Sequence, residues 1–302
     1  MSLIAVVLLL IAAFTHAGWN FISKKQHPTL AFYLVANTIG VFCVLPILPW
    51  FWNKIPLIPP CVWIFVIMSG FFLAVYMAAL AGAYRAGDMS IAYPLARSLP
   101  VIFVTVITIL LGKGHEVGWW LRSGIILVVI GCLMLPMKMF RDFRLWYYLN
   151  FCCLLAVLAA IGIAAYTIVD DTALRCLREL PGKPFHPVVA TLIYMVLEAI
   201  ACSLWMGIFV ILSSREHKNL REVLYAYKGS AALTGIGIYL TYGLVLLSMN
   251  YVVNVSYVAA FRQLSIPLGV LMGIFFLKEP HYRVKIFGVV SIFVGLVIVG
   301  LR

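Results

Sequence analysis

Two arginines stand inside apolar stretches of the sequence, where a positive charge needs a special environment. Arg97 lies between Pro94 and Pro100, and Arg262 lies in a second apolar stretch nearer the C-terminus. A charge near the centre of a bilayer is costly, so such a residue usually faces a cavity or a partner. A guanidinium group binds a carboxylate or phosphate through two hydrogen bonds. Both arginines are therefore candidates for an anion-binding site; the alternatives are a structural ion pair or a side chain that extends to the membrane surface.

Glu198 is the only acid in the middle of a predicted membrane span, within the apolar stretch from Ile193 to Met206. Two roles fit this position. Burial favours the neutral form of a carboxyl group, so Glu198 could couple transport to protons. It could equally be the counter-ion of an arginine. Asp170, at the end of another span, is expected at the membrane interface.

Polar and aromatic side chains in other spans are candidates for lining a cavity together with these charges. The candidates are His16, Trp19 and Asn20 in the last third of the first span, and Tyr93, Tyr166, Tyr242 and Tyr257. Aromatic residues also form belts at the two membrane surfaces, which is the alternative for Trp19. A buried tyrosine more often packs than binds a ligand. We keep all seven as candidate substrate-binding residues beside that alternative.

No motif for a metal, a cofactor or a catalytic reaction accompanies these residues. The seven cysteines lie mostly inside apolar stretches without CxxC spacing, so we interpret them as small apolar residues rather than disulfides or metal ligands. The sequence contains no HExxH, no GxSxG and no clustered pair of carboxylates. We expect a protein that is not an enzyme and that has no cofactor and no metal site.

The elements that must position these residues are membrane-spanning helices. The chain of 302 residues is 65% hydrophobic and 11% charged, and its mean hydropathy is +1.09, far outside the range of a soluble domain. A helix needs about 20 apolar residues to cross a bilayer. We expect an all-α membrane protein with ten transmembrane helices, at residues 2–22, 29–50, 62–84, 89–111, 117–138, 147–169, 187–212, 229–249, 254–277 and 283–301.

Two parts of the chain are related in sequence. Placing Arg97 on Arg262, an offset of 165 residues, also pairs Leu99 with Leu264, Lys113 with Lys278 and, after a one-residue gap, Gly124 with Gly288 and Gly131 with Gly295. Duplication is the simplest cause. The halves, residues 1–140 and 141–302, hold five spans each, so the second must enter the membrane in the opposite orientation. Inverted five-helix repeats support alternating access, although repeats also occur in membrane scaffolds that transport nothing.

Two connections are longer than the others. Residues 171–186 are expected to form a polar loop, and residues 213–228 place apolar side chains at helical spacing, as in a short helix that lies in the membrane interface and serves as an anchor. Between the third and fourth spans, Arg85 and Asp88 are three residues apart and are expected to form a local pair.

Most lysines and arginines lie in the connections and set the orientation of the chain. The connections after the odd-numbered spans hold thirteen of them, and the other connections with the C-terminal end hold seven. The positive-inside rule then places both termini outside the cytoplasm. The net charge of +12 does not indicate nucleic acid, because no basic face or RNA-binding signature accompanies it. The expected location is the cell (inner) membrane, as a multi-pass protein in contact with the lipid bilayer.

Several stretches resemble the EamA-type transporters of the drug/metabolite transporter superfamily, over essentially the whole chain. They are AYRAGDMSIAYPLARSLPV, NVSYVAAFRQLSIPLGVLMGIFFLKEP, HAGWNFISKK in the first span and AAYTIVDD in the sixth. The resemblance implies ten helices around a central cavity and a transporter that often exports amino acids or other small metabolites.

The arginines and this resemblance together predict a secondary transporter, as an exporter, of a small organic metabolite with an anionic group, such as an amino acid. Protons are the candidate coupling ion. One alternative is export of cationic or aromatic drugs, which is favoured if Glu198 and the tyrosines face the cavity instead of the arginines. The other is a membrane scaffold without transport activity.

Overall fold

The computed structural model describes residues 3–26, 28–108, 119–141, 148–182, 184–249 and 263–300, and every regular element within them is a helix. Each of the ten predicted ranges contains one: α1 (Leu3–Gln26), α2 (Leu30–Val44), α4 (Pro60–Ala86), α5 (Met89–Thr108), α6 (Trp119–Met134), α7 (Phe151–Arg178), α8 (Pro187–Leu212), α10 (Lys228–Met249), α12 (Ser265–Phe276) and α13 (Arg283–Gly300). The shorter segments are α3 (Ile47–Trp50), the 3-10 segment η1 (Trp52–Leu57), α9 (Ser214–Glu222) and the π-helical η5 (Val223–Tyr227).

Five helices are long and apolar enough to cross a membrane by length and composition. They are α1, α4, α7, α8 and the segment Leu30–Trp50, which contains α2 and α3. Within α5, α6 and α12 the described apolar helices are shorter. The all-α class and a multi-pass membrane protein are thus confirmed, and the number of ten spans stays a prediction.

Short polar side chains fix where helices begin after tight corners. The Thr29 hydroxyl accepts a hydrogen bond of 3.2 Å from the Phe32 N–H at the start of α2. The Asn150 side chain accepts one of 2.9 Å from the Cys153 N–H at the start of α7. Each bond satisfies an amide that has no partner within its own helix.

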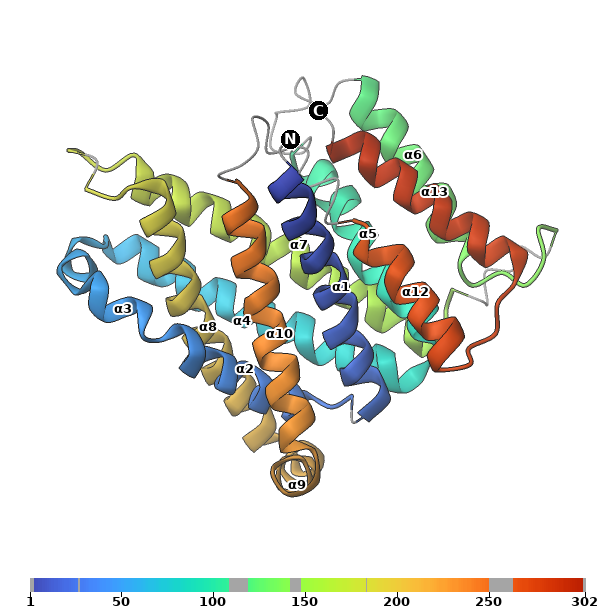
Figure 1. Cartoon of the computed structure of the whole chain (residues 1–302), viewed down its shortest axis with the longest axis horizontal. Helices are drawn as coiled ribbons and strands as arrows, with labels where there is room; N and C mark the ends of the chain where they lie inside the picture. The colour runs from blue at the N-terminus through green and yellow to red at the C-terminus, as the bar shows by residue number, and fades with distance from the viewer. Residues whose placement is uncertain are drawn as a thin grey trace.

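The long helices pack in a repeated pattern. In Figure 1, α1 and α10 run side by side through the middle of the molecule, and α6 and α13 form a pair at one edge. The first long helix of each half packs on the third and fourth of the other half: α7 packs on α4 and α5, and α1 packs on α10 and α12. The third long helix of each half packs on the second of the other half: α4 packs on α8, and α10 packs on α2. The contacts of the first five long helices therefore have counterparts among the last five.

Glycines allow α6 and α13 to approach backbone to backbone. A Cβ atom on Gly131 would lie 2.5 Å from the Gly288 carbonyl oxygen, and one on Gly295 would lie 2.6 Å from that of Gly124. These are the four glycines that the sequence alignment paired between the halves. Because the residue numbers increase along one helix as they decrease along the other, the two helices cross antiparallel.

Four connections meet at one end of the bundle, which we call the charged end: residues 24–30, 85–90, 213–222 and 278–285. Their side chains are joined by hydrogen bonds and ion pairs. At the opposite end, the α2–α4 and α7–α8 connections pack through apolar residues that include Leu48, Ile58 and Phe185. Among the described connections, these four and the α2–α4 and α7–α8 connections thus lie at different ends.

The predicted polar loop at residues 171–186 is wrong over its first half, because α7 continues to Arg178. Asp171 and Arg175 form an ion pair of 2.8 Å one turn apart, and Ala173 and Leu177 are buried. Charged residues at this spacing stabilise a helix rather than end it.

The short helix predicted at residues 213–228 is confirmed as a helix, and it has more than an anchoring face. α9 is seen end-on in Figure 1, crossing below α10, and it passes through η5 into α10 without a break. Arg221 and Glu222 are exposed, but Glu216 is only 8% exposed and turns towards the bundle. A carboxylate turned inward in this way needs hydrogen-bond donors or a cation, and Glu216 has both in the Ala31 N–H and Arg85.

Candidate functional site

Arg97 lines a small hollow between three helices. The hollow is partly open and has room for about one water molecule, and it is lined by Ala12, Ala13 and His16 of α1, Arg97 of α5, and Thr241 and Val245 of α10. The sequence predicted Arg97 and His16 at such a site, and the structure brings them to the same hollow. Thr241 was not predicted, because a single threonine in an apolar span carries no signal.

The Arg97 side chain is not neutralised within the described part of the chain. Its Nε atom is buried and has no hydrogen-bond partner there, and no described acid forms a salt bridge with it. Arg97 as a whole is half-buried, but a buried N–H donor left without an acceptor is costly. A ligand with a carboxylate or phosphate group would supply the missing charge and acceptors.

A chain of hydrogen bonds continues from the hollow towards the charged end. His16 Nδ1 and the Tyr93 hydroxyl are 2.8 Å apart, and the Asn20 side-chain N–H donates to the His16 carbonyl at 2.9 Å. The Tyr84 hydroxyl donates to Asn20 Oδ1 at 2.8 Å. His16, Asn20 and Tyr93, which were predicted separately, therefore form one network beside the hollow, and this network holds the His16 ring in place.

The other predicted aromatic residues have different surroundings. Trp19 is 5% exposed and packs against Gly237 of α10, so its side chain lies inside the bundle rather than on its outer surface. Its ring centroid lies 5.0 Å from that of His16. Tyr166 packs near Tyr76 with a centroid distance of 6.3 Å, and Tyr242 packs against the apolar cluster that contains Leu48 and Phe185. Arg262 and Tyr257 lie outside the described residues.

A second polar cluster surrounds Glu198, on the helices α4, α7 and α8. The Ser69 hydroxyl lies 2.9 Å from Glu198 Oε1 and also within hydrogen-bond distance of Asp170 Oδ1, to which the Tyr194 hydroxyl donates at 2.8 Å. Asp170 thus has two hydroxyl partners, Ser69 and Tyr194, which the sequence did not show. Within the described ranges neither acid has a salt bridge to a cation, so a role of Glu198 as counter-ion finds no partner there.

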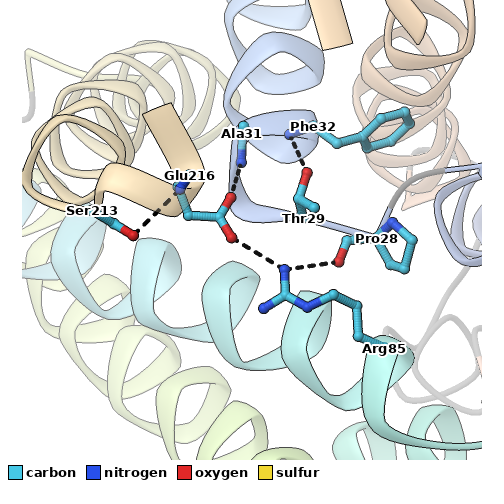
Figure 2. A network of polar contacts seen from close by, with 7 residues as sticks. All are labelled: Pro28, Thr29, Ala31, Phe32, Arg85, Ser213 and Glu216. Carbon is cyan, nitrogen blue, oxygen red and sulfur yellow. Dashed lines mark hydrogen bonds and ion pairs between the residues drawn. The ribbon is translucent and has the colours of Figure 1, made fainter. Parts of the chain in front are cut away.

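The charged end holds residues whose partners the sequence did not show. Arg85 Nη1 lies 3.1 Å from Glu216 Oε1 and donates to the Pro28 carbonyl at 3.3 Å (Figure 2). Asp88 lies instead 3.5 Å from Lys285 Nζ. The expected local pair of Arg85 and Asp88 is therefore wrong, because each residue pairs with a distant part of the chain.

Comparison with known proteins bears on the fold only. A solved structure described as "Crystal structure of protein" is similar to this chain with a TM-score of 0.51 and 17% sequence identity, and the match covers 99% of this chain and 97% of that one. No family model and no curated relative matches the sequence. Near-complete coverage of both chains indicates that the arrangement of helices along the whole chain occurs in another protein.

Proposed function

We propose that this chain is a secondary transporter, working as an exporter, for a small organic metabolite with an anionic group, such as an amino acid. The observation that carries the proposal is Arg97, whose buried Nε has no partner within the described residues and whose side chain lines a hollow between α1, α5 and α10. An anion would complete this site, and the network of His16, Tyr93 and Asn20 would orient it. The sequence resemblance to the EamA-type transporters described above also supports the proposal.

Alternating access is the mechanism that we propose for this transport. The contacts of the first five long helices have counterparts among the last five, and α6 and α13 cross through four glycines that the sequence pairs between the halves. Both observations support two inverted repeats, of residues 1–140 and 141–302. Two such repeats can exchange conformations and so expose one central site to each side of the membrane in turn.

Protons are the coupling ion that we propose. Asp170 and Glu198 lie in apolar helices, share contacts with Ser69 and have no cationic partner in the described part of the chain. Two carboxylates so placed are more stable when they hold a proton between them. Uptake of that proton can be linked to movement of the helices that carry the two acids.

The test is substrate binding and transport by the purified protein in liposomes, with a panel of radiolabelled amino acids as probes. Arg97→Gln should weaken binding by about 10- to 100-fold, the loss that corresponds to a charge-assisted hydrogen bond. Arg97→Lys should restore little, because lysine lacks the planar fork. Arg262→Gln should impair transport in the same way. Arg141→Gln, at an exposed arginine, is the matched control and should behave as the wild type.

A second candidate is export of cationic drugs, and the acidic pair Asp170 and Glu198 favours it. The same assay separates the candidates. Wild-type amino-acid transport by the Arg97→Gln and Arg262→Gln proteins would contradict an anion site. Transport of a lipophilic cation such as tetraphenylphosphonium, lost in Glu198→Gln, would establish the second candidate in its place.

A further inference from the structure

The corner between α4 and α5, residues 85–90, is held from two sides by charged residues of the second half of the chain. On one side it contacts α9, and on the other it contacts the connection between α12 and α13. Lys24 of α1 adds a third attachment, since its ammonium group donates to the carbonyls of Tyr84 and Gly87.

The attachment to the α12–α13 connection is buried and has several bonds. The Glu279 carboxylate accepts hydrogen bonds of 2.6 Å from the Met89 N–H and 2.8 Å from the Ser90 N–H, at the start of α5. Lys285 is 1% exposed and donates to the Ser90 hydroxyl at 2.9 Å and to the Pro280 carbonyl at 2.8 Å. A carboxylate at a helix N-terminus is well placed electrostatically. Separating these groups would leave a buried ammonium group and two amides without partners.

The attachment to α9 is smaller and closer to water. Figure 2 shows Glu216 between two partners, with one oxygen 3.0 Å from the Ala31 N–H at the start of α2 and the other 3.1 Å from Arg85. The Arg85 side chain is 33% exposed, against 2% for the Lys285 side chain. Water can therefore take over the bonds of Arg85 when the pair separates, which it cannot do for Lys285.

The hollow at Arg97 lies away from this end of the bundle. His16 is ten residues before the end of α1, Arg97 is eight residues after the start of α5, and Val245 is 17 residues after the start of α10. At a rise of about 1.5 Å per residue these side chains lie roughly 12–25 Å from the charged end. The groups between the hollow and the charged end are packed and hydrogen-bonded, as the chain from His16 to Tyr84 shows.

We propose that the Arg85–Glu216 ion pair holds the α4–α5 corner against α9 and so keeps the charged end of the transporter closed. We call this pair the latch, and the structure represents the closed state. The α4–α5 corner swings away from α9 when the pair separates, while Glu279 and Lys285 act as the hinge that keeps the corner attached to the α12–α13 connection. The proposal deepens the transport function and rests on it, because a gate has a purpose only in alternating access.

Native cysteines provide the test. Cys152 and Cys153 lie in the first turn of α7, are 6% and 3% exposed, and Cys152 is so close to Gly87 that a Cβ there would lie 2.8 Å from its sulfur. Opening of the corner should expose them to water. Cys61, at the start of α4 and thus at the opposite end, is already exposed and serves as an internal reference.

The measurement is the rate at which a water-soluble maleimide labels each cysteine in the full-length protein in lipid nanodiscs, read by mass spectrometry of the peptides. Glu216→Gln and Arg85→Gln should each raise the labelling rate of the peptide with Cys152 and Cys153 about fivefold, the factor expected for loss of a partly exposed ion pair. The rate at Cys61 should stay unchanged. Glu179→Gln, at an exposed acid beyond the end of α7, is the matched control.

Two results would overturn the latch. One is an unchanged rate at Cys152 and Cys153 in both variants, and the other is an equal rise at Cys61, which would indicate general loosening of the fold. The assay contains no substrate. If the protein transports none of the probes, the proposed function is contradicted and the labelling result still stands. If the protein transports a probe and its labelling rates are unchanged, only the latch is contradicted.

Discussion

Ser69 is a fully buried hydroxyl with a single hydrogen, and two carboxylates lie within its reach. It can donate that hydrogen to Asp170 or to Glu198, but not to both. If both acids were ionised, the remaining contact would bring two acceptors together. A proton on one of the acids resolves the conflict, since that acid then donates to the serine oxygen. For both contacts of Ser69 to be hydrogen bonds, one proton must therefore reside on Asp170 or Glu198.

This hydrogen count gives a prediction about pH. Glu198→Gln and Asp170→Asn should each abolish the pH dependence of transport and leave substrate binding measurable, because an amide keeps the shape of the side chain and does not titrate. The initial rate of transport into liposomes, taken over a series of external pH values, is the measurement. Glu179→Gln is the control and should keep the wild-type profile. An unchanged profile in both variants would make the pair a purely structural contact.

The helices themselves follow from the sequence, because a run of apolar residues is a local property. Each predicted range contains a helix, and the largest error is at the end of α7. There Asp171 and Arg175 look like loop residues in composition, but they pair along one helix face while Leu177 is buried on another. Polarity alone indicates where the membrane ends and not where a helix ends.

Contacts between elements were much harder to predict. Arg85 and Glu216 are 131 residues apart, and nothing in either neighbourhood marks the other as its partner. The sequence brought out Arg97 and His16 because their residue types are unusual in apolar spans. It left two places open for Trp19, because packing against Gly237 depends on how α1 meets α10. Residue types can identify members of a site, whereas their neighbours depend on the tertiary arrangement.

The close crossing of α6 and α13 leads us to predict how glycine substitutions there change the free energy of unfolding. In Gly131→Ala the added methyl group would meet the backbone of Gly288, which cannot move as a side chain can. The helices must separate, and we expect a loss of about 1–3 kcal/mol, as for other overpacked sites. Thermal unfolding of the purified protein measures it. Gly207→Ala in α8 has nothing within 4 Å and should be neutral or slightly stabilising. Equal melting temperatures for the two variants would contradict the tight crossing.

For the molecule as a whole, the two ends of the bundle differ in the side chains that hold their connections together. At the charged end, described connections are joined to one another by the ion pairs Arg85–Glu216 and Asp88–Lys285, whereas the α2–α4 and α7–α8 connections pack through apolar side chains. The N-terminal end of α1 and the C-terminal end of α13 lie at the same edge in Figure 1, away from α9. This agrees with an even number of crossings. Because the sequence predicts an excess of lysine and arginine in connections on the side of the charged end, we expect this end to face the cytoplasm.

A reporter can test this orientation. Green fluorescent protein joined after Arg302 should stay dark, because it does not become fluorescent when exported unfolded across the membrane. The same fusion with one additional transmembrane helix before the reporter is the control and should be bright. Strong fluorescence of the direct fusion would reverse the orientation and place the charged end outside.

The π-helical segment Val223–Tyr227 joins α9 directly to α10. No irregular residue separates α9 from α10, so the two helices and the wide turn between them form one continuous rod with a bend. Glu216 is near the tip of the short arm, and Thr241 and Val245 of the long arm line the hollow. Because the helix is continuous, a displacement of the long arm should be transmitted to the short arm. We therefore expect a ligand that displaces Thr241 to shift Glu216 as well, without any contact between them.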